Sequence, residues 1–234
     1  MHKQSGNALF LILIAVALFA ALSYAITQSG RGGGNISREK AAIAASQITQ
    51  YGAALHSAVQ RMIISGVPVD DQHYEKPGST VDGYYCGPAG AVTDKSRCVF
   101  YPEGGSMIWE CPTEDQVDMS VDSDNSGAHL HIWRFRDIHS QDSNGFYIKD
   151  VGTNTDGTGR DTFAYLRYVH LSVCQQINKG LGLDETPADN SNYADNYAAT
   201  YDLNANVMYA APGAPFACVD SGGYYSYYHA LVEQ

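Results

Sequence analysis

The sequence predicts an α+β protein, in which an N-terminal transmembrane helix and an amphipathic helix are followed by an antiparallel β-rich globular head. Three observations predict this fold class. A run of 19 residues without a charged side chain extends from Ala8 to Ile26. Apolar residues recur at helical spacing within residues 38–65. After residue 70, short aromatic and β-branched stretches alternate with stretches rich in Gly, Asp, Asn and Ser.

The apolar run is long enough to cross a bilayer. At about 1.5 Å per residue, a helix of this length measures close to 30 Å, which is about the thickness of the hydrocarbon core. Three interpretations fit the run: a cleaved secretory signal peptide, an uncleaved membrane anchor, and a helix that stays on the protein after a short leader is removed. A signal peptide has a shorter apolar core, of about 7–15 residues.

The residues before the run favour the third interpretation. Residues 1–6 form a polar leader that contains Lys3 and ends in Gly6, and Asn7 and the apolar stretch follow at once. This arrangement resembles the class III leader of type IV pilins and of the pseudopilins of type II secretion. The resemblance covers roughly residues 1–65. It implies cleavage between Gly6 and Asn7 by a prepilin peptidase, and it implies that residues 7–29 remain as a transmembrane helix.

The chain departs from the usual pilin pattern at two positions. The family has an aromatic residue first in the mature chain and a Glu fifth, where this sequence has Asn7 and Leu11. Its opening is more similar to that of minor, tip-type pilins and pseudopilins, some of which lack the Glu. A carboxylate inside a membrane is tolerated when it has a partner there. The absence of this Glu favours a tip or priming position for the subunit over repeated addition along a filament shaft.

A second helix is predicted after the apolar run. A glycine-rich hinge is expected at residues 30–37, because glycines weaken a helix. The amphipathic helix is then expected over residues 38–65, since Gly66 and Pro68 stop it. Its apolar stripe has two candidate uses, packing against the protein's own sheet or against other subunits in a bundle. The stripe consists of Ile48, Tyr51, Leu55, Val59 and Met62.

Residues 70–234 are predicted to fold as one acidic head with its own core. Of the chain's 14 Lys and Arg residues, nine lie in this region, together with 24 of the 25 Asp and Glu residues. The net charge of −11 therefore belongs to the head, which argues against nucleic acid and against the anionic bilayer surface as partners. Charges around the apolar run leave its orientation open, because basic residues lie on both sides of it.

The secondary structure of the head is expected to be mostly strand. Strands are expected at residues 83–86, 97–101, 106–111, 129–136, 145–151 and 222–233. A helix is expected over residues 162–183, where Gly180 and Gly182 end it. Many of the 17 tyrosines cluster at residues 193–209 and 224–228, where they suit half-buried strands or an exposed contact surface.

The five cysteines predict disulfide bonds. They include no Cys-x-x-Cys pair, which argues against a zinc ribbon or a redox site. Cys86 and Cys98 flank a short loop suited to a bridge. Cys174 and Cys218 are the expected second pair, with Cys111 left over, although spacing does not fix this connectivity and five buried thiols are the alternative. Disulfides indicate an oxidising compartment, the bacterial periplasm.

Residues with catalytic or metal-binding chemistry are few. His129 and His131 share one face of an expected strand, and Asp122 and Asp124 lie in an oxygen-rich loop; all four are weak candidates for metal ligands. Neither this loop nor a second one at residues 150–156 has the terminal Glu of an EF-hand, so Asx turns are the alternative to a calcium site. No nucleophile-elbow, phosphate-loop or dinucleotide motif occurs. The sequence predicts no enzymatic activity and no cofactor, with calcium the one ion that the loops suggest.

These features together predict a non-enzymatic, membrane-anchored pilin-like subunit, a minor pilin or pseudopilin, of a bacterial envelope filament or secretion assembly. It would be a single-pass protein of the bacterial inner membrane with its head in the periplasm or on the cell surface. Its partners would be the membrane and other pilin-like subunits, bound through the N-terminal helix. Two alternatives stay open: an anchored periplasmic binding or adhesion module that does not assemble, and a signal-anchored hydrolase.

Overall fold

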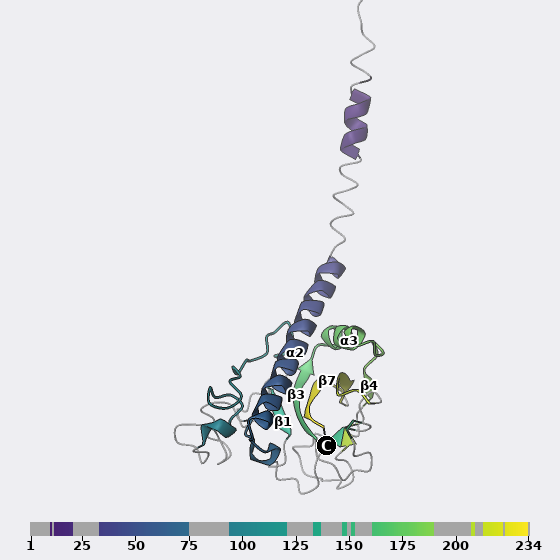
Figure 1. Cartoon of the computed structure of the whole chain (residues 1–234). Helices are drawn as coiled ribbons and strands as arrows, with labels where there is room; N and C mark the ends of the chain where they lie inside the picture. Colours follow the sequence, from purple (N-terminus) through teal and green to yellow (C-terminus); the bar gives the residue numbers. More distant parts are fainter. Residues whose placement is uncertain are drawn as a thin grey trace, which may run out of the picture. The chain divides into compact units, whose positions relative to one another are not determined.

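A computed structural model of the chain describes residues 10, 12–20, 33–74, 94–120, 133–136, 147–148, 151–152, 161–189, 207–208, 213–221 and 223–233 (Figure 1). The chain divides into two compact units, Met1–Lys40 and Ala41–Gln234. The described elements are, in chain order, α2 (Gly33–Ile64), η2 (Val69–Asp71), η3 (Lys95–Arg97), β1 (Arg134–Arg136), β2 (Tyr147–Ile148), β3 (Thr162–Val169), α3 (Leu171–Gly180), β4 (Ala188–Asp189), β5 (Val207–Met208), β6 (Phe216–Asp220) and β7 (Tyr225–Val232).

In the first unit, the described part of the apolar run is helical. Residue 10 and residues 12–20 have helical backbone, and their large apolar side chains are exposed, up to 74% at Phe19. Within the described residues, no helix combines the length and the apolar character that crossing a bilayer requires. The limits of the predicted membrane helix, Ala8 and Ile26, and the predicted processing residues lie outside the described residues.

α2 begins earlier than the sequence suggests. The predicted hinge at residues 30–37 is wrong for its second half, because α2 already begins at Gly33. Adding a residue to an existing helix gains a backbone hydrogen bond, and the N–H groups of the first turn need no acceptor within the helix. The Ala-rich segment that follows therefore extends through the two glycines. The helix ends at Ile64, close to the predicted end, and Gly66 turns the chain with a φ of +93°.

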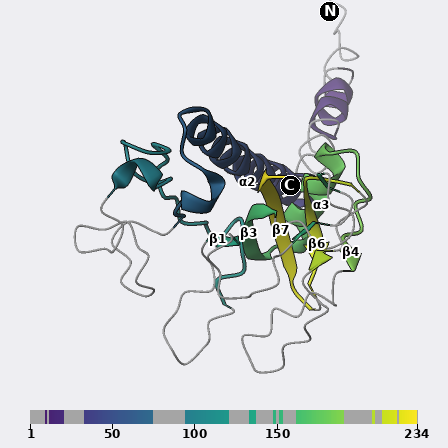
Figure 2. The same cartoon turned by 60° about the horizontal axis from the view of Figure 1, so that its bottom comes forward.

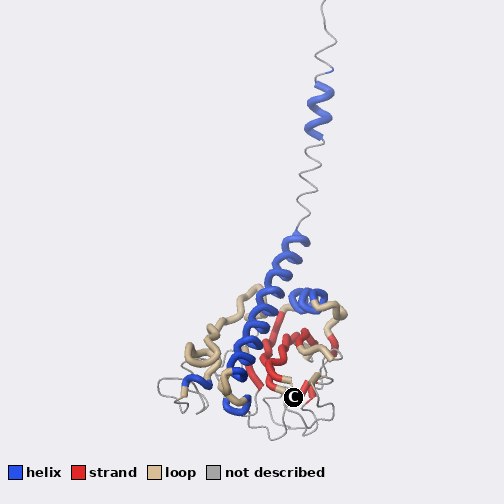
Figure 3. Tube along the Cα trace, viewed as in Figure 1, coloured by secondary structure: helices blue, strands red, loops and turns tan. Residues whose placement is uncertain are grey.

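In the described part of the second unit, five strands form one sheet in the order β1-β3-β7-β6-β4. Strands β1, β3, β7 and β6 are antiparallel to their neighbours, and β4 pairs in parallel with β6. β2 and β5 form a separate short parallel pair. Figure 2 shows β3, β7, β6 and β4 side by side, and Figure 3 shows the second unit as helices beside this sheet. The predicted α+β class with an antiparallel sheet in the head is confirmed.

Both faces of the sheet are buried. On one face, Leu166 of β3 and Tyr227 and Leu231 of β7 belong to the same apolar cluster as the α2 stripe. On the other face, Tyr165 of β3 and Tyr228 of β7 pack in a second cluster. The two clusters alternate along each strand because successive side chains point to opposite faces. Tyr227 and Tyr228 are fully buried, so this part of the tyrosine cluster lies in a strand covered on both faces, neither the half-buried strand nor the exposed contact surface that the sequence suggests.

The predicted apolar stripe of α2 is buried as a whole. Its members Ile48, Tyr51, Leu55, Val59 and Met62 are each no more than 8% exposed and belong to the cluster that includes β3 and β7. Of the two candidate uses, the structure shows packing against the protein's own sheet. This packing places one flank of α2 over β7, where the candidate site is found.

The predicted helix at residues 162–183 is wrong over its first half. Residues Thr162–Val169 form β3, and α3 follows over Leu171–Gly180. Nearly every residue of β3 is buried, so the strand lacks the alternation of apolar and polar residues that marks a strand with one solvated face. Its Thr, Phe, Tyr and Val residues nevertheless favour extended backbone. Only the second half of the segment is a helix, and it ends at Gly180 as expected.

Two further predicted strands, at residues 97–101 and 106–111, are also wrong. Arg97 ends η3, Cys98 forms only an isolated bridge with His73, turns follow from Val99, and residues 106–111 have no strand structure. The cause is a compact loop in which Gly104 and Gly105 approach the backbone of Cys98 and Val99 too closely for any Cβ. The predicted strand at residues 83–86 lies outside the described residues. β1, β2 and β7 fall within the remaining three predicted strands.

Candidate functional site

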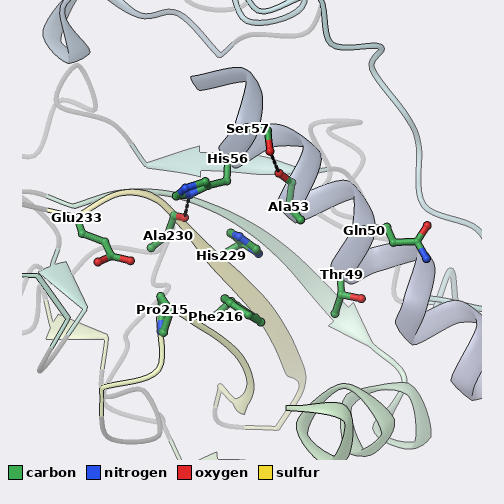
Figure 4. Close-up of a pocket in the computed structure, with 10 residues that line it drawn as sticks. All are labelled: Thr49, Gln50, Ala53, His56, Ser57, Pro215, Phe216, His229, Ala230 and Glu233. Atoms are coloured by element: carbon green, nitrogen blue, oxygen red, sulfur yellow. Dashed lines mark hydrogen bonds between the residues drawn. The ribbon is translucent and has the colours of Figure 1, made fainter. Parts of the chain in front are cut away.

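A cavity of about 470 Å³ lies between α2 and strands β6 and β7 (Figure 4). Its volume is in the range of small-molecule sites. The side chains that line it come from α2 on one side and from the β6–β7 region on the other, and two of them are histidines. They are Thr49, Gln50, Ala53, His56 and Ser57 from α2, and Pro215, Phe216, His229, Ala230 and Glu233 from the sheet side.

His56 is hydrogen-bonded to the backbone of β7. Its Nδ1 atom lies 3.0 Å from the carbonyl oxygen of Ala230. A carbonyl oxygen can only accept, so Nδ1 carries the proton and donates it, and the Nε2 atom of the neutral ring is then an acceptor. One turn further along α2, the Gln60 side chain donates to the carbonyl oxygen of Leu231 at 3.2 Å. These two bonds fix the flank of α2 against β7.

His229 is buried under α2, with 6% of its surface exposed. Its Nδ1 atom lies 2.7 Å from the hydroxyl oxygen of Tyr227. Burial raises the pKa of Tyr227, so this hydroxyl keeps its proton and remains hydrogen-bonded to the His229 ring. The ring stacks on Phe216 at 4.7 Å between centroids, and the His56 ring lies 6.0 Å away.

The surroundings of His229 keep its ring neutral. Burial, and to a smaller extent the neighbouring His56, lower the pKa of His229 from 6.5 to about 4. The other groups at this place are Tyr227 on the same strand and Glu233 on the rim of the cavity. Charge on His229 is thus disfavoured over the whole range in which an exposed histidine titrates.

The buried neutral ring makes the stability of the head depend on pH. We expect the free energy of unfolding to fall by about 3 kcal/mol as the pH is lowered from 6.5 towards 4. In this window the unfolded chain binds a proton at His229 and the folded chain does not, so the loss begins below the ordinary pKa and is complete near the lowered one. Urea unfolding at pH 7 and pH 4.5 measures it.

The variant His229→Gln is the control for this prediction. Glutamine cannot take up a proton, so we expect its unfolding free energy to change with pH by about 3 kcal/mol less than that of the unchanged chain. His56→Gln and Glu233→Gln measure how much the two titratable neighbours contribute to the pH dependence. Equal pH dependence in His229→Gln and in the unchanged chain would contradict the assignment of the buried neutral histidine.

One of the predicted disulfides is present in full. Cys174 of α3 and Cys218 of β6 are bonded, with their Cα atoms 5.3 Å apart. Cys111 is a free, exposed thiol, as expected for the cysteine left over. Cys98 is disulfide-bonded, and its predicted partner Cys86 lies outside the described residues. The covalent bond attaches α3 to the sheet beside α2.

A smaller cavity of about 170 Å³ lies next to the free thiol of Cys111 and is lined in part by Tyr51 and Trp133. The Tyr51 hydroxyl donates to the carbonyl oxygen of Ile108 and accepts from the backbone N–H of Glu110. Burial raises the pKa of Tyr51 to about 12. Its contacts with the backbone of this loop, together with a ring contact to Trp133 at 5.0 Å, are structural.

The predicted metal-ligand candidates are untested by the structure. His129, His131, Asp122 and Asp124 lie outside the described residues. Among the residues that the structure does describe, no three His, Cys, Asp or Glu side chains are grouped so as to hold a metal ion.

The sequence alone does not mark the two histidines of the cavity as functional residues. His56 borders the apolar stripe of α2, and His229 lies in the tyrosine-rich last strand, so each reads as part of an ordinary element. His56 and its partner Ala230 are 174 positions apart, and only the packing of α2 on β7 brings them together.

Comparisons with protein-family models, with curated proteins and with solved structures found no match. A function for the chain therefore has to be inferred from its own residues.

Proposed function

We propose that the chain is a membrane-anchored pilin-like subunit, a minor pilin or pseudopilin of the tip type, in a bacterial envelope filament or secretion assembly. The exposed apolar helix at residues 10 and 12–20 carries the proposal. Large apolar side chains such as Phe10, Leu18 and Phe19 are each more than 60% exposed. A continuous apolar surface of this kind is stable in lipid or against the apolar helices of neighbouring subunits.

The described part of the second unit supports the same proposal. A long helix, α2, packs its apolar stripe on an antiparallel sheet, an arrangement similar to that of the pilin head. The Cys174–Cys218 disulfide and the bonded state of Cys98 fit a head that folds in an oxidising compartment. The head would accordingly face the periplasm or the cell surface, and residues 8–26 would form the single membrane span.

Leader processing tests the proposal. We expect co-expression with a prepilin peptidase to produce a chain that begins at Asn7, which mass spectrometry of the N-terminal peptide detects. The variant Gly6→Glu should keep its leader, because a large charged residue replaces the small one at the expected cleavage point. Asn7→Ala, which changes the other side of the same bond, should still be processed.

The outcomes of this experiment are distinct. Peptidase-dependent cleavage after residue 6 in the unchanged chain and in Asn7→Ala, but not in Gly6→Glu, supports the proposal. An intact leader in all three chains, or cleavage that does not need the peptidase, contradicts it.

The second candidate is an anchored periplasmic binding module that does not assemble. One observation favours it: the cavity beside His56 and His229, which has the size of a ligand site. A subunit of an assembly should form cross-links to other pilin-like proteins through a photoreactive residue placed at Ile43, an exposed apolar position on α2. A binding module should not.

A further inference from the structure

In the wall of the cavity beside His56 and His229, most hydrogen-bond donors are already bonded within the protein, whereas acceptors remain available. Thr49 Oγ1 already donates to the carbonyl oxygens of Ala45 and Ser46, and Ser57 Oγ donates to that of Ala53. Both hydroxyl oxygens keep lone pairs that can accept. The donors of the α2 wall are thus largely consumed by α2 itself, and the capacity that remains is that of an acceptor.

The histidine and amide groups extend this pattern. His56 donates its N–H to the Ala230 carbonyl oxygen, so its Nε2 atom is left to accept. Gln50 donates through Nε2 to Ser46 Oγ at 2.8 Å, which leaves its carbonyl oxygen and one N–H. The Nδ1 atom of His229 is already engaged by the Tyr227 hydroxyl, so this ring offers a ligand only its Nε2 atom. Acceptors outnumber donors among the groups still available to a ligand.

The charge at the cavity is negative, which also favours a ligand that donates hydrogen bonds. Glu233 lines its rim, and the described residues that line the cavity include no lysine and no arginine. Within the part of the chain that the structure describes, no ion pair engages Glu233. The chain as a whole carries a net charge of −11. A cation approaching this face therefore gains from both the local and the long-range field.

The apolar part of the wall suits the body of such a ligand. Ala53 and Pro215 present small apolar surfaces, and Phe216 presents an aromatic ring that is partly exposed (Figure 4). One face of Phe216 is stacked on His229, which holds the ring in place. An aromatic ring attracts a cation over its face and packs edge-to-face against another ring. Phe216 can therefore contact either the ammonium group or the ring of an aromatic amine.

We infer that this cavity binds a small organic cation, an ammonium or amidinium group carried on an aromatic or alkyl body. Its N–H groups bond to the acceptors of His56 and Ser57, which are neighbours on α2 (Figure 4), and pair with Glu233, while its body lies against Phe216 and Ala53. The head is then a binder of small amines in addition to its proposed role as a subunit, and neither property depends on the other.

Calorimetric titration of the full chain, in a nonionic detergent at pH 7.5, tests this with three probes of one shape: benzylammonium, benzyl alcohol and benzoate. We expect benzylammonium to bind with a Kd of about 1 mM or tighter and one site per chain. Benzyl alcohol, which lacks the charge, and benzoate, which has the opposite charge, should bind at least about fivefold more weakly.

Two pairs of variants locate the site. Ala53→Leu fills the cavity from α2 and should weaken benzylammonium binding about tenfold or more. Ala54→Leu makes the same change at the neighbouring exposed position, which does not line the cavity, and should bind as the unchanged chain does. Glu233→Gln should weaken benzylammonium about two- to fivefold and leave benzyl alcohol unchanged.

The inference is overturned if benzoate binds as tightly as benzylammonium, if Ala53→Leu binds like Ala54→Leu, or if benzylammonium gives no saturable heat. Leucine is a good helix former, so both alanine variants keep α2. Matching far-ultraviolet circular dichroism of the two variants confirms that they are folded.

Discussion

Removing the Cys174–Cys218 disulfide is expected to lower the free energy of unfolding of the head by about 4 kcal/mol. The bond closes a loop with a sequence separation of 44. In the chain-entropy model, a cross-link of that span restricts the unfolded chain by about this amount. Both cysteines are buried, so their replacement also removes packed atoms from the apolar cluster. We expect the double variant Cys174→Ala/Cys218→Ala to show the full loss in urea unfolding.

A second contact between α3 and β6 should allow the double variant to fold without the disulfide. The Asn178 amide of α3 donates to the carbonyl oxygen of Cys218 and accepts from its backbone N–H, both at 2.9 Å. These bonds hold α3 on β6 without the disulfide, so the variant should fold with lower stability. Cys111→Ala, at the exposed free thiol, is the matched control and should change the unfolding free energy by less than about 0.5 kcal/mol. Equal stability of both variants would contradict the structural role of the bond.

The variant Gly52→Leu is expected to destabilise the head by about 3 kcal/mol. Gly52 lies where α2 crosses β7, and a Cβ atom built on it would be 2.7 Å from His229 Nδ1 and 2.9 Å from the Tyr227 hydroxyl. Both partners are buried and hydrogen-bonded to each other, so they have no room to move. Any side chain at this position pushes α2 away from the sheet and opens the Tyr227–His229 bond.

Helix propensity makes this a sharp test, because it acts in the opposite direction. Glycine inside a helix costs about 1 kcal/mol relative to alanine, so a substitution in open space should stabilise. Gly180→Leu, at the end of α3, is the matched control, since nothing lies within 4 Å of a Cβ built there. Thermal unfolding followed by circular dichroism should show a fall in Tm for Gly52→Leu and an equal or slightly higher Tm for Gly180→Leu. The close approach of α2 to β7 is wrong if the two variants have the same Tm.

Local periodicity predicted the elements that have one buried face or one clear boundary. The α2 stripe from Ile48 to Met62 follows the helical repeat, and the tyrosine-rich segment after Gly223 follows strand propensity. Both became the elements expected. The Cys174–Cys218 pair was also predicted, although its spacing alone left other connectivities open.

The errors arose where tertiary packing decides the local structure. β3 is buried on both faces, so its apolar residues fit a helix as well as a strand by pattern alone. β6 was missed because Phe216–Asp220 is a short apolar run between Pro215 and the glycines that precede Tyr224, with no alternation. The compact loop at Gly104 and Gly105 depends on close backbone contacts with Cys98 and Val99, which no periodicity reveals.

The candidate site could not be predicted at all, for a related reason. Its acceptor character comes from which hydrogen bonds each side chain has already made, such as His56 with Ala230 and Tyr227 with His229. The first of these bonds joins residues 174 positions apart, on α2 and the last strand, and the second lies within β7. A list of polar residues in the sequence does not contain that information.

We propose that the apolar segment stays on the finished protein and holds an oxidised head outside the cytoplasm. The decisive measurement is the intact mass of the protein extracted from membranes, after alkylation of free thiols without reduction. We predict a chain that begins at Asn7 and carries one alkyl group, on Cys111. A soluble form that begins near residues 24–27, or a chain with all five cysteines alkylated, would contradict the claim.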